Sequence, residues 1–170
     1  MKICFITGHN YSKQCGITDY VELLAKELEK LEHQVERYFF KMECDLLTDL
    51  PDADLYSIQF APYAYDSNGM PKTILNLIAE ELCNKNVHLN FHEIWVGAYP
   101  RANLKEKGIG WLQKKLILGF INKCKPVWIT SSNAAALNRL KQAGVPAMFL
   151  YYLVIYPTLP NPKQQLKDKP

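Results

Sequence analysis

The residues Cys15-Gly16-Ile17-Thr18-Asp19-Tyr20 join two patterns that together indicate the fold. Before them, residues 2–7 form a short apolar run that ends at Gly8 and is typical of a buried strand. After them, from about Thr18 to Leu31, apolar residues recur with helical spacing and charged residues occupy the opposite side. We therefore predict a strand, a loop and a helix, with Thr18 as the helix N-cap.

The loop at Gly16 is the first candidate binding site. In α/β proteins, ligands bind in the crevice at the carboxyl ends of the strands. A glycine lets the backbone approach a ligand, and the helix that follows offers free N–H groups and the positive end of its dipole, which suit phosphate. The backbone amides of Gly16 and Ile17 are thus candidate phosphate donors. The alternative is that Gly16 only turns the chain.

The alternation of strand and helix continues along the chain. We predict further strands over residues 34–40, 54–60, 87–91, 126–130 and 146–152, and helices over residues 71–83, 110–124 and 133–143. Such alternation implies parallel pairing through right-handed crossovers. The expected fold is α/β, a Rossmann-like, doubly wound, mostly parallel sheet of about six strands. We expect Trp111, Leu112 and Phe120 to face the core, and residues 62–69 to form a Tyr-rich loop.

Composition narrows the class of protein. The chain of 170 residues suits one domain, and its 48% hydrophobic and 22% charged residues are ordinary for a soluble globular protein. A net charge of +3 does not by itself indicate nucleic acid. Five scattered cysteines without a CxxC pair argue against a disulfide framework, and the histidines lack the spacing of metal ligands. With neither a signal peptide nor an apolar run of ~20 residues, we expect a cytoplasmic protein without a metal site.

The last residues differ in composition from the rest. We predict one domain over residues 1–156 and a linker or tail over residues 157–170, which contains four prolines among polar residues and lysines. Because a linker normally joins domains, we expect a second domain to be absent from this polypeptide.

Several segments resemble family 4 glycosyltransferases in their order and spacing. CGITDYVELLAKELEKLEHQV resembles the opening loop and helix of that family, with Glu32 in place of the usual glycine. DADLYSIQF resembles the third strand and supplies Gln59, whereas NFHEIWVG resembles the fourth and supplies His92. Residues 110–147 resemble the later helix, strand and Gly-hydrophobic-Pro turn. The resemblance spans about residues 1–150, and residues 151–156 depart from the family pattern.

The resemblance implies a GT-B architecture, in which two Rossmann-like domains face each other across a cleft. This chain matches only the N-terminal, acceptor-side domain. It would serve glycan biosynthesis as half of a retaining hexosyltransferase, with a nucleotide-diphosphate sugar as donor, a glycan or lipid-linked acceptor, and no cofactor. In the family, the C-terminal domain holds most of the donor. That domain is therefore an expected partner, and this chain alone is expected to be inactive.

The resemblance and the loop positions also suggest individual site residues. His92 matches a histidine that contacts the donor sugar in the family, and the alternative is a structural histidine. With Glu93 it forms the candidate catalytic pair, in which Glu93 orients the imidazole, receives an acceptor hydroxyl or only caps the next turn. Gly16, Ile17 and His92 are the expected donor contacts. The expected acceptor contacts are Tyr11, Asp19, Gln59, Tyr65 and Arg101.

The segment of residues 101–125 concentrates positive charge. It contains seven basic residues and one acidic residue, a net +6, whereas the whole chain carries +3. Trp95 and Trp111 stand near it. A basic helix with aromatic neighbours indicates a peripheral contact with the inner membrane face or with a polyanionic acceptor. The alternative is a solvated helix face.

Two other functions are alternatives to the transferase. A stand-alone, non-catalytic Rossmann-like binding module fits the same fold. A dinucleotide oxidoreductase is disfavoured, because the first loop lacks GxGxxG and the strand over residues 34–40 does not end in an acidic residue.

Overall fold

The computed structural model describes residues 1–8, 16–40, 49–99 and 101–151, so the predicted tail over residues 157–170 lies outside the described residues. The elements follow one another as β1 (Lys2–Thr7), α1 (Gly16–Lys30), β2 (Gln34–Phe39), β3 (Leu55–Phe60), α2 (Pro62–Tyr65), α3 (Lys72–Glu81), β4 (Val87–Phe91), α4 (Leu104–Cys124), β5 (Trp128–Ser131), α5 (Ala134–Gln142) and β6 (Met148–Phe149).

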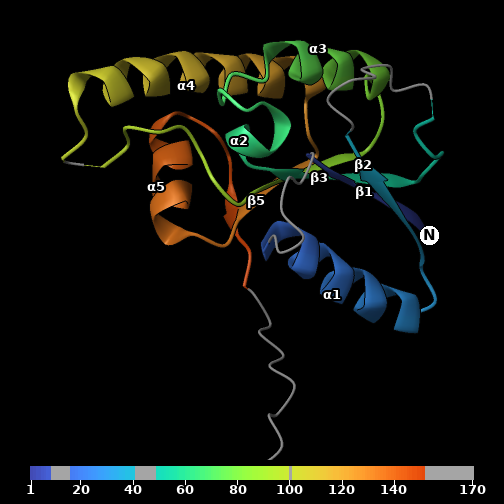
Figure 1. The fold of residues 1–170 in the computed structure, drawn as a ribbon. Helices are drawn as coiled ribbons and strands as arrows, with labels where there is room; N and C mark the ends of the chain where they lie inside the picture. The colour runs from blue at the N-terminus through green and yellow to red at the C-terminus, as the bar shows by residue number, and fades with distance from the viewer. Residues whose placement is uncertain (9–15, 41–48, 100, 152–170) are drawn as a thin grey trace, which may run out of the picture.

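All six of these strands pair in parallel, in the order β2-β1-β3-β4-β5-β6. Helix α1 covers one face of the sheet, and α2, α3 and α4 lie on the other (Figure 1). This confirms the predicted Rossmann-like, doubly wound fold. The winding direction reverses between β1 and β3, and ligands of such sheets bind outside the carboxyl ends of the strands at that reversal.

The two faces of the sheet bury different amounts of apolar surface. The larger cluster joins α3, α4 and α5 to the central strands and contains the aromatic side chains of Phe60, Tyr65 and Phe91. The smaller cluster packs α1 onto β1 through Ile3, Phe5, Val21 and Ala25. The face toward α1 therefore has a small apolar core, and its remaining strand positions are available to polar side chains.

Some element boundaries differ from the predictions. Helix α1 begins at Gly16, so Thr18 lies inside its first turn and is not the N-cap. Helix α4 begins at Leu104 rather than near Gly110, because Asn103 and Glu106 form a capping box with two reciprocal hydrogen bonds of 2.9 Å. The expected Tyr-rich loop contains the short helix α2, and β6 has only two residues.

The predicted orientation of α4 was wrong for two of its apolar residues. Trp111 and Leu112 are 56% and 45% exposed, whereas Phe120 is buried as predicted. Because α4 is apolar on several sides, periodicity alone does not identify its inner face. Gly110 does: a Cβ at this residue would stand 1.9 Å from the Val96 carbonyl oxygen, so the glycine admits the chain that follows β4. The buried positions are Gly110, Gln113, Ile117, Phe120 and Cys124.

The turn after α1 keeps the geometry that glycine favours, although it contains no glycine. Glu32 has a φ of 61°, in the left-handed region. Around it, the Glu32 and His33 amides donate to the carbonyls of Glu29 and Leu28 at 3.0 and 3.1 Å. Glutamate in place of glycine at this residue thus leaves the turn itself intact.

Candidate functional site

Polar side chains form a row across four strands near their carboxyl ends. The parallel register pairs Thr7 of β1 with Gln59 of β3, Gln59 with Asn90 of β4, and Asn90 with Thr130 of β5. Since paired residues of adjacent strands share a face, all four point to the side of the sheet that carries α1. All four are buried. This row crosses the reversal between β1 and β3, where the fold favours ligand binding.

Three members of the row belong to a closed circuit of hydrogen bonds. The circuit runs from Gln59 to Ser57, His88, Thr130, Asn90 and back to Gln59, with donor–acceptor distances of 2.8 to 2.9 Å. The side-chain Oδ1 atom of Asn90 can only accept, so the Thr130 hydroxyl donates to it and in turn accepts from His88 Nε2. In a neutral imidazole His88 Nδ1 then accepts from Ser57, and every group donates in the same direction around the circuit.

This circuit has consequences for His88 and for the strand ends. Burial lowers the pKa of His88 to about 4, so the ring is neutral at neutral pH, as the circuit requires. Each side chain in the circuit both donates and accepts a hydrogen bond, which offsets the cost of burying these groups. The circuit therefore cross-links β3, β4 and β5 through side chains, and we assign it a positioning role.

His92 is attached to this circuit. Its Nε2 lies 2.8 Å from Gln59 Oε1, and because an amide oxygen only accepts, this imidazole nitrogen donates. The Asn90 amide nitrogen is further away, at 3.3 Å from the same atom. Burial lowers the pKa of His92 to about 4. His92 is thus a neutral imidazole, oriented by Gln59, at the carboxyl end of β4.

Helix α1 meets His92 at this edge. The ring of Tyr20 stands edge-on to the ring of His92, with 5.3 Å between centroids. Tyr20 lies about one turn after Gly16, so the N-terminus of α1 and His92 lie at the same edge of the sheet. Gly16 is exposed, and no atom of the described residues lies within 4 Å of the position that a Cβ would take. Ile17 is half-buried and Asp19 is exposed in the same first turn.

Thr7 is the last residue of β1 and Gly8 follows it, and neither was predicted as a site residue. The Thr7 hydroxyl is buried and has no hydrogen-bond partner among the described residues. A buried hydroxyl without a partner costs about 1–3 kcal/mol, which makes it a candidate ligand contact. A Cβ at Gly8 would stand 2.0 Å from the Ala64 carbonyl oxygen, so α2 packs directly on the strand end. A glycine directly after an apolar strand was the only signal in the sequence.

Two predicted acceptor contacts are corrected by their burial. Tyr65 is 1% exposed, and its hydroxyl lies 3.1 Å from the Ile6 carbonyl oxygen and 3.2 Å from that of Gln59. It cannot stack on a sugar, because α2 turns it into the core and leaves Tyr63 exposed. Gln59 is fully buried and hydrogen-bonds to His92, so its side chain is not exposed to an acceptor.

The other predicted residues are more exposed or lie elsewhere. Glu93 is exposed directly after His92, and its amide donates to the Phe60 carbonyl at 3.4 Å. Arg101 is exposed in the turn before α4. Tyr11 lies outside the described residues. The structure thus brings Gly16, Ile17, Asp19, His92 and Glu93 to one edge of the sheet.

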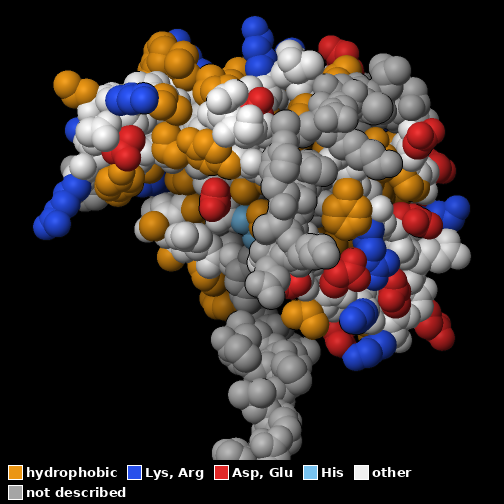
Figure 2. Space-filling view, viewed as in Figure 1, with side chains coloured by type: hydrophobic (Ala, Val, Ile, Leu, Met, Phe, Trp, Pro, Cys, Tyr) orange, Lys and Arg blue, Asp and Glu red, His pale blue; other side chains and the backbone are white. Residues whose placement is uncertain are grey.

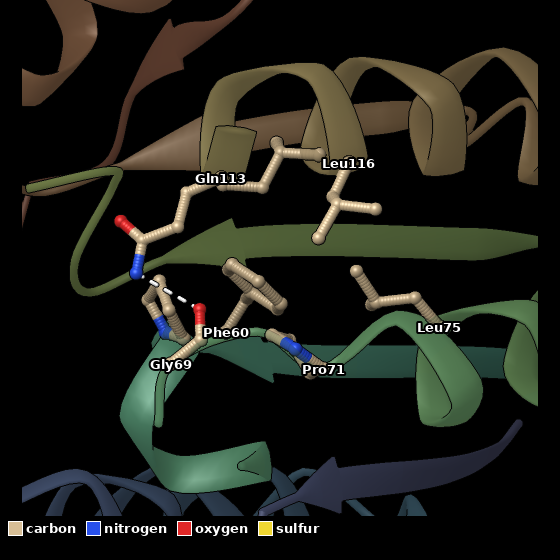
Figure 3. Close-up of a pocket in the computed structure, with 8 residues that line it drawn as sticks. Phe60, Gly69, Pro71, Leu75, Gln113 and Leu116 are labelled. Carbon is tan, nitrogen blue, oxygen red and sulfur yellow. Dashed lines mark hydrogen bonds between the residues drawn. The ribbon is translucent and has the colours of Figure 1, made fainter. Parts of the chain in front are cut away.

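A partly open cavity under α4 is not part of this edge. It comprises about 160 Å³ of empty space, some of it open to solvent, between mainly apolar side chains, including those of Phe60, Leu75 and Leu116 (Figure 3). Gln113 closes one end, where its amide donates to the Gly69 carbonyl and accepts from the Val96 amide, both at 2.8 Å. The cavity is too narrow for a water molecule, so it is a packing defect of the larger core.

The chemistry of the edge suits a polar, uncharged or anionic ligand. A helix N-terminus offers amides to phosphate, and a neutral histidine hydrogen-bonds to hydroxyls. Within the described ranges, no three His, Cys, Asp or Glu side chains gather in a way that would hold a metal ion. Comparison with models of known protein families and with curated proteins gives no match.

Proposed function

We propose that this chain is the acceptor-binding half of a retaining glycosyltransferase that uses a nucleotide-diphosphate sugar. One observation carries the proposal: the rings of Tyr20 and His92 lie 5.3 Å apart, which brings the start of α1 beside the end of β4. Phosphate and sugar are adjacent in such a donor. A phosphate-binding helix terminus next to a hydroxyl-binding histidine therefore matches its chemistry.

Each group at the edge has a role in this proposal. The amides of Gly16 and Ile17 approach the diphosphate, and the positive end of α1 stabilises its charge. His92 is neutral and so hydrogen-bonds to a sugar hydroxyl without attracting a counterion. Asp19 and Glu93 are exposed carboxylates at the rim of the same edge, and they bind hydroxyls of the acceptor glycan or lipid-linked glycan.

A second domain or polypeptide completes the proposed enzyme. It holds most of the donor, and closure of the two halves brings the acceptor hydroxyl to the anomeric carbon while excluding water. The bond from that carbon to the diphosphate breaks, the acceptor oxygen forms the new glycosidic bond with the same anomeric configuration, and the nucleoside diphosphate leaves with the proton of the acceptor hydroxyl. The chain by itself binds weakly and transfers no sugar.

A specific observation favours a second candidate, a non-catalytic binding module. The Nε2 atom of His92 donates to Gln59, and burial lowers the pKa of this imidazole to about 4. A histidine in that state is a poor general base near pH 7. The same edge would then recognise a phosphate-bearing sugar without transferring it.

The test measures binding of UDP- and GDP-sugars, and sugar transfer, by the chain alone and mixed with a C-terminal family 4 domain. Gly16→Val blocks the helix terminus, and Gly108→Val is its matched control, since both are exposed helical glycines without a described atom near the Cβ position. His92→Ala is compared with His33→Ala, another half-buried histidine.

Three outcomes separate the proposals. Transfer in the mixture that is lost in Gly16→Val and His92→Ala, but kept in both controls, supports the split transferase. Binding with the same mutational pattern and no transfer supports the binding module. No binding in any setting contradicts both.

A further inference from the structure

The outward face of α4 exposes apolar side chains that the core does not use. Leu104 is 87% exposed, and Trp111 and Leu112 are exposed by about half. Trp111 lies seven positions after Leu104, so the two side chains differ by only about 20° around the helix. Figure 2 shows hydrophobic side chains gathered along α4, at the upper left, with lysine or arginine side chains beside them. This is a second apolar stripe, opposite the buried one.

Lysines border this outward face. Lys115 holds its ammonium 3.8 Å from the ring centre of Trp111, and Lys114 lies 5.5 Å from that of Trp95. The one acidic residue of α4, Glu106, is engaged in the capping box with Asn103. Among the ion pairs of the described residues, none involves a lysine of α4. Its positive charge is therefore available to an external anion.

A groove between α3 and α4 adds to this surface. It holds about 460 Å³ open to solvent, with an apolar floor and three lysines at the rim, one of which, Lys123, donates to Asn76 Oδ1 at 2.9 Å. The floor consists of Leu75, Leu116 and Phe120, and the rim lysines are Lys72, Lys115 and Lys123. Lys115 belongs both to this rim and to the outward stripe, so groove and stripe are continuous.

We propose that the outward face of α4 and the adjoining groove dock this protein on an anionic lipid bilayer. Leu104, Trp111 and Leu112 enter the boundary between headgroups and acyl chains, and the lysines lie against lipid phosphates. Tryptophan suits this depth because its ring is apolar and its N–H is polar. Among the described helices, none is long and apolar enough to cross a membrane, so α4 lies along the surface.

The apolar stripe is what favours a bilayer over a soluble polyanion. A polyanionic glycan binds the lysines but gains nothing from an exposed Leu104. A bilayer uses both, since apolar burial and electrostatic attraction add in interfacial helices. The proposal does not depend on the transferase: α1 and α4 both begin toward the carboxyl ends of the strands, but they lie on opposite faces of the sheet (Figure 1).

The experiment is co-sedimentation of the full chain with vesicles of phosphatidylcholine, alone or mixed with phosphatidylglycerol. We expect binding only to the mixed vesicles, with an affinity that falls as salt is added. The variant Leu104→Ser/Trp111→Ser/Leu112→Ser should lose binding at least about tenfold. Its matched control is Leu23→Ser/Leu31→Ser, which changes two exposed leucines at α1. Replacing Lys105, Lys115 and Lys123 by glutamine should weaken binding by about a hundredfold at low salt.

A spectroscopic readout separates insertion from charge attraction. Trp111 fluorescence should shift to the blue on the mixed vesicles, and Trp111→Phe should remove the shift while binding persists. Circular dichroism checks that each variant is folded. If the serine variant binds mixed vesicles as well as the wild type does, or if wild-type fluorescence does not shift on binding, the surface binds polyanions and the bilayer proposal is overturned. Absence of binding to mixed vesicles overturns it as well.

Discussion

The Nε2 atom of His92 donates to the Oε1 atom of Gln59 over 2.8 Å, and this contact joins the candidate site to the hydrogen-bond circuit beneath it. Gln59 Oε1 accepts from both His92 and Asn90, while its amide nitrogen donates to Ser57. One buried side chain therefore orients the exposed end of the site and closes the circuit.

Replacing Gln59 by leucine should destabilise the protein by about 2–4 kcal/mol, because Ser57, Asn90 and His92 each lose a partner and two of them are fully buried. Urea unfolding measures the change. Gln34→Leu is the matched control, since Gln34 is exposed on β2 and should shift stability by less than about 0.5 kcal/mol. Similar losses in the two variants would contradict the circuit.

Acid should destabilise the protein between pH 6.5 and pH 4. Burial lowers the pKa values of His88 and His92 from 6.5 to about 4. Within this window, the two imidazoles therefore bind protons in the unfolded chain but not in the folded chain. Stability therefore falls as pH falls through the window, by up to about 3 kcal/mol for each imidazole, and this contribution levels off below pH 4. Urea midpoints at several pH values measure the slope. The variant His92→Gln should show a smaller slope than the wild type, whereas an unchanged slope would show that His92 does not contribute.

Two glycines of α4 should respond oppositely to alanine. A Cβ at Gly110 would overlap the Val96 carbonyl oxygen, whereas a Cβ at Gly119 meets no described atom within 4 Å. Gly110→Ala should cost more than about 2 kcal/mol, and Gly119→Ala should stabilise by about 0.5–1 kcal/mol through helix propensity. Thermal unfolding of the two variants tests this directly. A tolerated Gly110→Ala would mean that the segment after β4 does not pack this closely on α4.

Glu32→Gly should stabilise the protein by about 0.5–1 kcal/mol. Glu32 adopts a φ of 61°, and the relief of left-handed strain exceeds the entropy that a glycine adds to the unfolded chain. Asn84 has a φ of 66°, and Asn84→Gly is the comparison, with a smaller gain because asparagine tolerates this region. Chemical denaturation distinguishes the two. A destabilised Glu32→Gly would show that entropy outweighs strain at this turn.

The sequence predicted two parts of the site, the start of the first helix and the residue that follows the fourth strand. Gly16 precedes a strongly amphipathic helix, and His92 directly follows an apolar run, so both were expected at the carboxyl edge and both are found there. The circuit was not predicted, because its members are separated by up to 73 residues and ordinary strand patterns contain serine, threonine and asparagine as well.

Misassigned residues share one physical cause. Trp111, Leu112 and Tyr65 are large apolar or aromatic residues in segments with more than one apolar side. Local periodicity does not distinguish these sides, and tertiary packing decides which of them is buried. In α4, Gly110 and Gln113 set the buried side. Gly110 leaves room for the Val96 carbonyl, and the Gln113 side chain hydrogen-bonds to the backbone of Val96 and Gly69.

By itself, the sequence determined the order of strands and helices, the parallel α/β fold and the edge at which His92 and Gly16 lie, because these follow from local hydrophobic periodicity and from the handedness of crossovers. Only the tertiary structure decided which face of α4 points outward, that Tyr65 is buried, and that Gln59 orients His92. Those features depend on register and close approach between distant segments. Nothing in a local pattern encodes them, since each residue's neighbours are set only when the sheet has formed.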